Sequence, residues 1–521
     1  MQPLPIGIQT FKNIREGDFL YVDKTKWIYE LVRNPNAVYF LSRPRRFGKS
    51  LTLSTLKEIF EGNRELFQGL WIYNADYHWK KYPIIRIDFS KQKAESKEEL
   101  KRFILEQLDY NAESYGVQLT KKEYFSRFEE LIKAISKKDK IVILIDEYDK
   151  PIIDHLTKPE LAIEMREILK GFYTIIKASD EYLRFVLLTG VSKFSKTGVF
   201  SGLNNLNDIS MSLRYSAIAG ITEEELKNNF KEYTAEFSNT VKISEDELLQ
   251  KIRHWYNGYC FSGQCEKVYN PFSTLLLFEN KEFKNYWFET GTPSFLIDLA
   301  KEKDFAISEL PILAEETSFS TYEVDELDVI PLLFQTGYLT LKGYDPERLL
   351  YTLDYPNFEV KNAFLQQFTR RYTNRVFQES KLYGLIDSLR ERDFENFFLV
   401  LRSIFANIDY DLHIPAEKYY QTIFYLIFTL IGLRVSAEVK TNIGRIDAVI
   451  EDRGGIFLFE FKFSGTKEEA LAQIRKNKYF EKYLSPAVTH GQTALQREIY
   501  LFGVEFSDKN AGEWVMEKMT G

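Results

Sequence analysis

The stretch from Leu41 to Leu51, L-S-R-P-R-R-F-G-K-S-L, most constrains what this 521-residue chain can fold into. It follows the apolar run Val38–Phe40, and a helical pattern of apolar residues begins at Gly48-Lys49-Ser50. A buried strand, a turn and a helix in this order are the context in which a glycine-containing loop wraps phosphate groups. Backbone N–H groups and the helix N-terminus then face the phosphates.

Two residues of this Walker A-like loop have specific expected roles. The Lys49 ammonium would reach the outer phosphates, and the Ser50 hydroxyl would bind Mg²⁺. A full motif begins with glycine, whereas this chain has Arg43 and Pro44 at that place. The alternative interpretation is a basic helix start without a ligand. The other residues expected to contact the nucleotide are Arg45, Arg46, Phe47, Gly48 and Leu51.

A second apolar segment, Ile141–Ile145, ends in the acids Asp146 and Glu147. Its β-branched residues are typical of a strand buried on both faces of a parallel sheet. In Walker B chemistry, Asp146 would hold the Mg²⁺ shell opposite Ser50, and Glu147 would orient or polarise the attacking water. A solvated acidic turn would explain this segment alone, but its occurrence downstream of the loop favours a P-loop ATPase.

Strands and helices alternate from Val38 onward, which predicts a doubly wound, mostly parallel α/β sheet. The loop after Thr189 leaves the carboxyl end of a buried strand, where such sheets bind ligands. Thr189 or Ser192 is therefore a candidate γ-phosphate contact, and an ordinary surface loop is the alternative. The expected strands are Val38–Ser42, Ile84–Phe89, Ile141–Ile145, Leu183–Thr189 and a short strand at Ile209–Leu213.

We expect four parts: an ATPase-like domain (1–215), a helical lid (216–300), a winged-helix-like region (301–380) and a nuclease-like domain (381–521). A capping box, Thr222 to Glu225, opens the lid. The winged-helix-like region lacks a recognition helix rich in Arg and Asn, so we expect it to dock onto the ATPase. Asp23 and Lys24, in Y-V-D-K-T, either cap a helix or lie near the nucleotide base.

Composition excludes several classes of protein. The formal net charge of -7 gives no sign that the surface as a whole binds polyanions. Binding of nucleic acid would therefore need a local basic groove. The apolar run Tyr419–Leu433 is too short to span a bilayer, and the start of the chain lacks a signal-peptide pattern. With only two cysteines, Cys260 and Cys265, and His254 as the nearest further ligand, we expect free buried thiols, no zinc site and a cytoplasmic location.

A second chemical site is expected near the carboxyl terminus. Residues 434–440, 444–451 and 455–463 have the pattern of three strands with tight turns, followed by a helix over 467–483. Glu460 and Lys462 share one face of the third strand, and Asp447 on the preceding strand can lie opposite them. Two carboxylates binding Mg²⁺ beside a lysine form a phosphodiester-cleaving site. Gln473 and Glu417 are weaker candidates, and a surface ion pair between Glu460 and Lys462 is the alternative.

Several motifs together resemble bacterial AAA-ATPase-like proteins that carry a C-terminal PD-(D/E)XK nuclease-like domain. They are Y-V-D-K-T (21–25), L-S-R-P-R-R-F-G-K-S (41–50), Y-N-G-Y (256–259), Y-N-P-F (269–272), N-Y-W-F-E-T-G-T-P (285–293), G-R-I-D-A-V-I (444–450) and F-E-F-K (459–462). The resemblance implies that Gly48, Lys49 and Ser50 bind ATP, with Asp146 and Glu147 on the Mg²⁺ side. It also implies a restriction-endonuclease-like site made of Asp447, Glu460 and Lys462.

The expected function is therefore ATP binding and hydrolysis coupled to a Mg²⁺-dependent nuclease-like domain. ATP and Mg²⁺ are the expected cofactors, and nucleic acid, DNA ahead of RNA, is the expected partner. No membrane association is expected, and the sequence leaves the oligomeric state open. The alternative is a nucleotide-dependent switch whose C-terminal domain binds a partner or DNA without cutting.

Overall fold

The computed structural model describes residues 1–519 apart from 92, 195–197, 204, 265, 288–293, 304, 306–309, 374–378, 406–416, 431–433, 441–444, 453–454, 463–464, 485–497 and 507–510. The chain divides into two compact units. The first contains Met1–Leu296 and Pro311–Lys361, and the second contains Ile297–Leu310 and Asn362–Gly521. The unit boundaries fall inside helices α12 (Ser294–Glu302) and α15 (Phe358–Thr373). The expected division into four parts stays a prediction.

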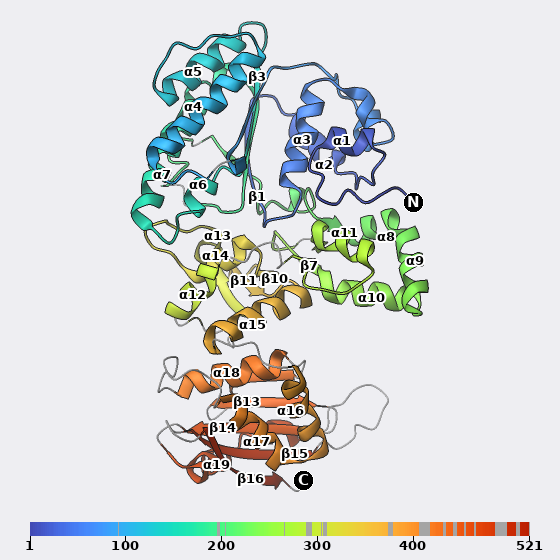
Figure 1. Ribbon diagram of the computed structural model, residues 1–521, viewed down its shortest axis with the longest axis vertical. Coiled ribbons are helices and arrows are strands. Elements are labelled where there is room, and N and C mark those ends of the chain that lie inside the picture. Colours follow the sequence, from blue (N-terminus) through green and yellow to red (C-terminus); the bar gives the residue numbers. More distant parts are fainter. Residues whose placement is uncertain are drawn as a thin grey trace. The chain divides into compact units, whose positions relative to one another are not determined.

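A parallel five-stranded sheet with the strand order β2-β3-β4-β1-β5 forms the centre of the first unit (Figure 1). Every residue of β3 is buried, as expected for a strand covered on both faces. The predicted α/β class is confirmed. The strands are β1 (Ala37–Ser42), β2 (Ile84–Asp88), β3 (Ile141–Asp146), β4 (Leu183–Gly190) and β5 (Asn207–Asp208).

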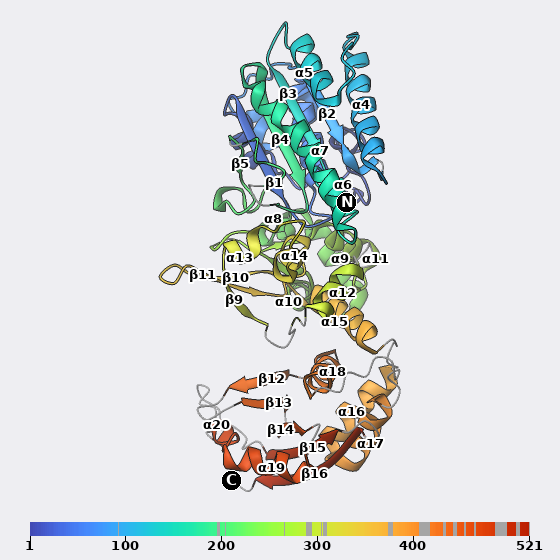
Figure 2. The ribbon, with the colours of Figure 1, turned by 90° about the vertical axis from the view of Figure 1, so that its left-hand side faces the viewer.

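Helices cover both faces of this sheet, and Figure 2 shows its strands side by side. One face carries α4 (Lys97–Ser114), α5 (Tyr124–Ile135), α6 (Lys150–Ile153) and α7 (Pro159–Ala178). The opposite face carries α1 (Phe11–Glu16), α2 (Thr25–Val32) and α3 (Lys49–Phe60). The sheet is therefore doubly wound.

The short edge strand lies at Asn207–Asp208, and its prediction at Ile209–Leu213 is wrong. Ile209 still donates its N–H to the Phe40 carbonyl at 2.9 Å, but the chain then turns, with Ser212 N–H bonded to the Ile209 carbonyl at 3.2 Å. Leu213 is 59% exposed and starts a 3₁₀ turn. The apolar residues of this segment therefore lie in a turn and not in a strand.

The helical lid has its own apolar core around Phe230, Phe237, Ile252 and Phe278. Its capping box is confirmed, because Thr222 accepts the Glu225 N–H and Glu225 accepts the Thr222 N–H. The elements are β6 (Ile221–Thr222), α8 (Glu223–Asn229), α9 (Lys231–Val241), α10 (Glu245–Tyr256), β7 (Asn257–Tyr259), β8 (Val268–Tyr269) and α11 (Pro271–Asn280).

The winged-helix-like region contains a helix, a hairpin and a helix, preceded by a further strand and a short helix. Its three-stranded sheet has the order β10-β11-β9. The elements are β9 (Ile312–Glu315), α13 (Thr317–Ser320), α14 (Val329–Thr336), β10 (Thr340–Asp345) and β11 (Leu350–Asp354).

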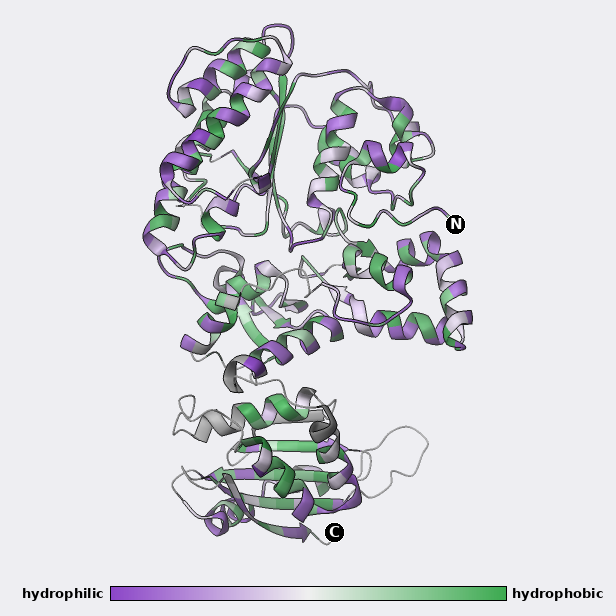
Figure 3. Ribbon diagram, in the orientation of Figure 1, coloured by the Kyte–Doolittle hydropathy of each residue, from purple (hydrophilic) through white to green (hydrophobic). Residues whose placement is uncertain are grey.

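The second unit is built on the mixed sheet β12-β13-β14-β15-β16, in which only β14 and β15 run parallel. Figure 3 shows the apolar strands of this sheet in green. The strands are β12 (Arg434–Lys440), β13 (Arg445–Asp452), β14 (Gly455–Lys462), β15 (Glu498–Phe506) and β16 (Ala511–Met519). The further helices are α16 (Glu379–Glu391), α17 (Phe394–Phe405), α18 (Glu417–Leu430), α19 (Lys467–Lys476) and α20 (Glu481–Leu484).

Three of these strands match the predicted ranges to within a residue or two, whereas β15 and β16 were not predicted. The expected helix over 467–483 is two shorter helices, α19 and α20.

Two smaller expectations concern the setting of the chain. Among the described residues, no helix has the length and apolar character needed to cross a membrane. The expectation of free thiols is wrong for Cys260, which is disulfide-bonded, and Cys265 lies outside the described residues. A low cysteine count argues against a framework of several disulfides, but it does not exclude a single disulfide.

Candidate nucleotide and carboxylate sites

The phosphate loop joins β1 to α3, as its sequence predicts. Gly48 begins the helix in the left-handed conformation, at φ +87°, and a Cβ added there would meet no atom within 4 Å. Arg46 is also left-handed, at φ 68°, although it is not glycine. Arg45 and Arg46 are exposed, whereas Phe47 is buried. The loop thus presents open space in front of Gly48 and two exposed guanidinium groups.

Lys49 is buried within this loop. Its Nζ donates to the carbonyls of Arg43 and Pro44, at 3.0 and 3.1 Å. Burial lowers the pKa of the Lys49 ammonium, and the carboxylates of Glu147 and Asp146 act in the raising direction. The lysine therefore lies within electrostatic reach of the acids at the end of β3, as a P-loop site requires.

The acids at the end of β3 are held in place by hydrogen bonds. Asp146 is 3% exposed, and its Oδ1 accepts the Thr189 hydroxyl at 2.8 Å and the Glu147 N–H at 3.1 Å. Glu147 is half-buried and left-handed, at φ 46°. A non-glycine residue in this conformation persists only where its surroundings hold it, and such residues cluster at functional sites. The Thr189 hydroxyl thus orients Asp146, and its expected contact with a phosphate stays a prediction.

Asp149 was not singled out by the sequence pattern, yet it is the most perturbed acid near the loop. Its Oδ2 accepts the N–H groups of Val191 and Ser192, at 3.0 and 2.5 Å. Burial raises the pKa of the Asp149 carboxyl to about 7, while the Ser192 N–H acts in the lowering direction. The side chain thereby ties the end of β3 to the loop after β4.

The loop after β4 is also held by the winged-helix-like region. The Tyr322 hydroxyl donates to Ser192 Oγ at 2.8 Å, and Gln335 accepts the Lys193 N–H at 2.7 Å. Ser192 is 1% exposed. Its hydroxyl is therefore bonded within the protein, and its expected contact with a γ-phosphate stays a prediction.

Arg43, which stands in place of the first glycine of the motif, is 1% exposed. Its guanidinium donates to the carbonyls of Ser210 and Tyr215, at 2.6 and 3.2 Å, and lies 4.1 Å from the Phe261 ring. Burial lowers the pKa of the Arg43 guanidinium to about 9, against the raising effect of the Asp208 carboxylate. Arg43 thus holds the loop in place as a buried residue with hydrogen bonds to distant parts of the chain.

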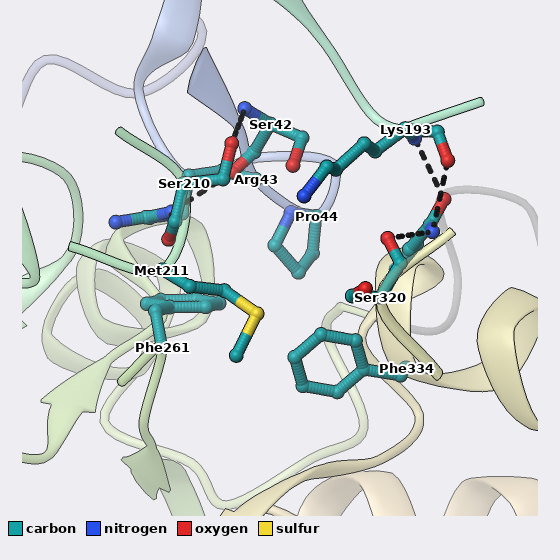
Figure 4. A pocket seen from close by; sticks show the side chains of 10 residues that line it. Ser42, Arg43, Pro44, Lys193, Ser210, Met211, Phe261, Ser320 and Phe334 are labelled. Atoms are coloured by element: carbon teal, nitrogen blue, oxygen red, sulfur yellow. Dashed lines mark hydrogen bonds between the residues drawn. The ribbon is translucent and has the colours of Figure 1, made fainter. Parts of the chain in front are cut away.

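A small cavity of about 370 Å³ lies beside Arg43. Figure 4 shows Pro44, Met211, Phe261 and Phe334 around it, with the Lys193 amine pointing inward. Lys193 Nζ is paired with the Asp208 carboxylate at 2.7 Å. The cavity is lined by residues from the start of the phosphate loop and from the winged-helix-like region.

A larger, mainly apolar cavity of about 620 Å³ lies on the other side of the loop. It joins the phosphate loop to the amino-terminal segment and the lid. Its lining includes Tyr21, Val22, Lys24, Gly48, Leu51, Thr52, Ile218, Gly220, Pro271 and Leu275. A mostly apolar lining with a few polar groups is typical of a small-molecule site.

Residues of the Y-V-D-K-T motif hold the start of a helix and line the larger cavity. Asp23 Oδ1 accepts the N–H and hydroxyl of Thr25, at 2.8 and 2.7 Å, so the helix-capping interpretation fits Asp23. Lys24 does not cap the helix with its side chain, because its Nζ donates to the Ala217 carbonyl at 3.0 Å and to Glu225 at 2.7 Å. Burial lowers the pKa of the Lys24 ammonium, against the raising effect of Glu225. Lys24 thereby connects the amino-terminal segment to the lid at the rim of this cavity.

In the second unit, the acids predicted on neighbouring strands meet at the open end of the β13–β14 ladder. The last pairing in this direction is Ala448 with Phe459, so Asp447 and Glu460 form the next rung on one face. Asp447 Oδ2 accepts the Phe461 N–H at 2.7 Å. The Asp447 side chain thus takes a backbone hydrogen bond where the ladder stops.

The Glu460 carboxylate is the buried centre of this group. It is 1% exposed, and the Gln473 amide of α19 donates to its Oε1. Lys462 Nζ lies 3.9 Å from the same oxygen and is a quarter exposed. The structure therefore gathers Glu460, Lys462 and Gln473 around one point, while Asp447 of the neighbouring strand is bonded to the Phe461 N–H. The Glu417 side chain lies outside the described residues.

The opposite face of β14 is a core of aromatic rings. Phe459 and Phe461 are fully buried, and both pack against Phe424, with ring centroids 4.9 and 5.0 Å apart. Phe461 also packs against Phe506 at 5.6 Å. The expected separation of chemistry and packing on the two faces of β14 is observed for these residues, whereas Phe463 lies outside the described residues.

The donor set of the carboxylate site suits Mg²⁺, which binds oxygen ligands through one or two carboxylates and keeps several waters. Among the described residues, no group of three or more His, Cys, Asp or Glu side chains could hold a metal ion. A site in the second unit would therefore rest on the carboxylates of Asp447 and Glu460 with water completing the shell.

Comparisons with known proteins match two parts of the chain to family models. Residues 5–200 match the family model described as "Predicted AAA-ATPase", and residues 415–513 match the model of the PD-(D/E)XK nuclease superfamily. The chain is 41% identical over 522 aligned residues to a protein of Azotobacter chroococcum mcd 1 named "Uncharacterized protein in vnfD 5'region". The alignment covers 97% of this chain and 96% of that relative.

Proposed function

Because the chain belongs to the family that joins an AAA-ATPase-like region to a PD-(D/E)XK nuclease domain, we propose that it binds and hydrolyses ATP and cleaves nucleic acid with Mg²⁺. DNA is the proposed substrate in preference to RNA. The observation that carries the proposal is the buried Glu460 carboxylate, which is bonded to Gln473 and lies beside Lys462, on the rung next to Asp447. A surface ion pair would not explain why the Glu460 carboxylate is buried and bonded to Gln473.

Nucleotide binding rests on Lys49 and the open space before Gly48. Arriving phosphate oxygens would replace the Arg43 and Pro44 carbonyls as acceptors of the Lys49 ammonium, and a buried charge gains more from such a bond than an exposed one. The cavity of about 620 Å³ begins at Gly48 and Thr52, so the adenine base would enter it while the phosphates stay at the loop. Its apolar lining suits an aromatic base.

Hydrolysis is assigned to the acids at the end of β3. Ser50 and Asp146 would hold Mg²⁺, which supplies charge neutralisation for the phosphates when bound. The Thr189 hydroxyl holds Asp146 in place through Oδ1. Glu147 would accept a hydrogen bond from the attacking water and draw away its proton.

Cleavage of the phosphodiester is assigned to the second unit. Asp447 and Glu460 would hold Mg²⁺, which lowers the pKa of a bound water when present. Gln473 orients Glu460 through Oε1, and Lys462 offers its ammonium to the negative charge of the phosphate. The repulsion between the two carboxylates favours a cation between them.

The test is nicking of supercoiled plasmid by the full chain, with Mg²⁺ and with or without ATP. Asp447→Ala should abolish nicking, because one of the two metal-binding carboxylates is lost. Asp452→Ala is the matched control on the same strand, since Asp452 pairs with Arg390 at 3.2 Å and lies outside the site. Cleavage of RNA but not plasmid would revise the substrate class.

Nucleotide binding without any cleavage would refute the nuclease part of the proposal. It would favour the alternative of a nucleotide-dependent switch whose second unit binds a partner. Cleavage that is the same with and without ATP would refute the coupling alone, since each site could then act by itself.

A further inference from the structure

The phosphate loop is contacted by side chains from outside the parallel sheet. The Arg43 guanidinium lies 4.1 Å from the Phe261 ring, and the Arg46 guanidinium lies 4.8 Å from the Phe272 ring. Figure 4 shows Arg43 beside Phe261. Phe261 and Phe272 belong to the lid, and Phe272 ends the Y-N-P-F motif that the proposed function does not use.

Two further contacts fix the middle of the loop. The Trp287 indole N–H donates to the Arg45 carbonyl at 3.2 Å. Gly337 of the winged-helix-like region is left-handed, at φ +93°, and a Cβ added there would lie 2.7 Å from Pro44 Cβ. Only glycine allows this close approach without strain. Trp287 also belongs to a motif, N-Y-W-F-E-T-G-T-P, that nucleotide chemistry alone does not explain.

Trp287 is itself firmly placed. Its backbone N–H donates to Glu359 Oε1 at 2.7 Å, and the Ser273 hydroxyl donates to the same oxygen at 3.0 Å. Its ring packs against Tyr338 at 5.2 Å. Trp287 is 6% exposed and Glu359 is fully buried. The indole is therefore a rigid donor aimed at the loop.

The loop needs such external support because glycine is missing from its first half. Arg46 is held at φ 68°, a conformation that costs a non-glycine residue free energy and persists where contacts over-determine it. In glycine-rich loops the backbone reaches the phosphate-binding curve without strain. Phe272 contacts this strained residue, Arg46, and Trp287 contacts the residue before it, Arg45.

We propose that Trp287 and Phe272 are positioning residues, which hold the backbone of Arg45 and Arg46 in the curve that receives the phosphates. The inference rests on the proposed nucleotide site. It adds that the lid controls the shape of this site. If lid contacts favour the phosphate-binding curve, bound phosphates must favour the lid contacts by the same free energy. The lid and the phosphates of the nucleotide are thereby coupled through the loop, by a route that does not involve the base.

The test measures the affinity of the full chain for ATP and for adenosine by titration calorimetry. Trp287→Phe keeps an aromatic ring and removes the bond to the Arg45 carbonyl, so ATP should bind roughly fivefold more weakly, as for one lost hydrogen bond. Adenosine affinity should not change, because adenosine has no phosphates. Trp255→Phe is the matched control, since Trp255 also belongs to the lid and its ring packs on Phe283 and Phe358.

A second variant keeps the test decisive if Trp287→Phe fails to fold. Phe272→Leu keeps an apolar side chain and removes the ring facing Arg46, and it should weaken ATP binding about threefold. Equal losses for ATP and adenosine, or no loss for either, would overturn the positioning role. A wild type that binds adenosine but not ATP, or neither, would overturn the proposed nucleotide site and this inference with it.

Discussion

Asp149→Asn should change how the stability of the first unit depends on pH. The wild-type carboxyl is 1% exposed and accepts two backbone N–H groups, from Val191 and Ser192. An asparagine amide oxygen can accept the same two bonds without carrying a charge. The substitution therefore removes the titration of this group and keeps its hydrogen bonds.

The magnitude follows from the shifted pKa of Asp149. Burial raises it from 3.8 to about 7, so as pH rises the unfolded chain releases this proton before the folded chain does. The associated stabilisation is complete below about pH 4 and is lost progressively until about pH 7. One pKa unit corresponds to about 1.4 kcal/mol, so wild type should lose about 2 kcal/mol relative to Asp149→Asn between about pH 5.5 and pH 8.5.

Urea unfolding of the full chain, followed by tryptophan fluorescence, measures this difference. Of the six tryptophans only Trp514 belongs to the second unit, so the signal reports mainly on the first. Glu130→Gln is the matched control, because Glu130 also accepts two backbone N–H groups, from Thr120 and Lys121, but is only half-buried. Hydrogen bonds to the Lys121 N–H and the Thr120 hydroxyl lower the pKa of Glu130, so its substitution should have the same effect at both pH values.

A constant difference in the free energy of unfolding between wild type and Asp149→Asn at the two pH values would refute the reasoning. A difference that moves in favour of wild type as pH rises would also refute it, since it would mean that the buried carboxylate is stabilised as an anion.

Lys49→Ala should weaken ATP binding by a few kcal/mol, because a charge-assisted bond to phosphate is lost; equal affinity of variant and wild type in calorimetry would contradict this. Glu147→Gln should retain ATP and slow phosphate release about a hundredfold, on the scale of a lost catalytic base; unchanged turnover would remove that role from Glu147. Asp447→Ala should abolish plasmid nicking and cost only about 1 kcal/mol of stability, from the lost bond to the Phe461 N–H, whereas Phe461→Ala should cost roughly 3 to 5 kcal/mol, because its ring is fully buried. Strong destabilisation by the first substitution and not by the second would mean that the two faces of β14 are assigned wrongly.

The sequence by itself determined the local elements of both sites. A strand, loop and helix around Gly48 and an apolar strand ending in Asp146 are periodic patterns within a few residues, and β1, α3 and β3 form where these patterns stand. The same holds for Glu460 and Lys462, because alternation along one strand assigns both to one face. Resemblance to a known family then supplied the chemistry expected of these residues.

Only the tertiary structure decided which partners each charged group has. Arg43 stands where the motif has glycine, and its role as a buried strut follows from the Ser210 and Tyr215 carbonyls, which lie far along the chain. Asp149 has a raised pKa because the loop after β4 closes over it. Neither fact leaves a periodic signal, because burial and hydrogen-bond partners arise from the pairing of distant segments.

The short strand β5 illustrates the same limit at the level of secondary structure. The apolar residues near Ile209 suggested a strand there, but pairing with β1 extends only over Asn207–Asp208 before the chain turns. In the second unit, Gln473 bonds to Glu460 only because α19 packs on β14. Local propensity therefore sets which residues can form a strand or a site, and the packing of distant elements decides which of them do.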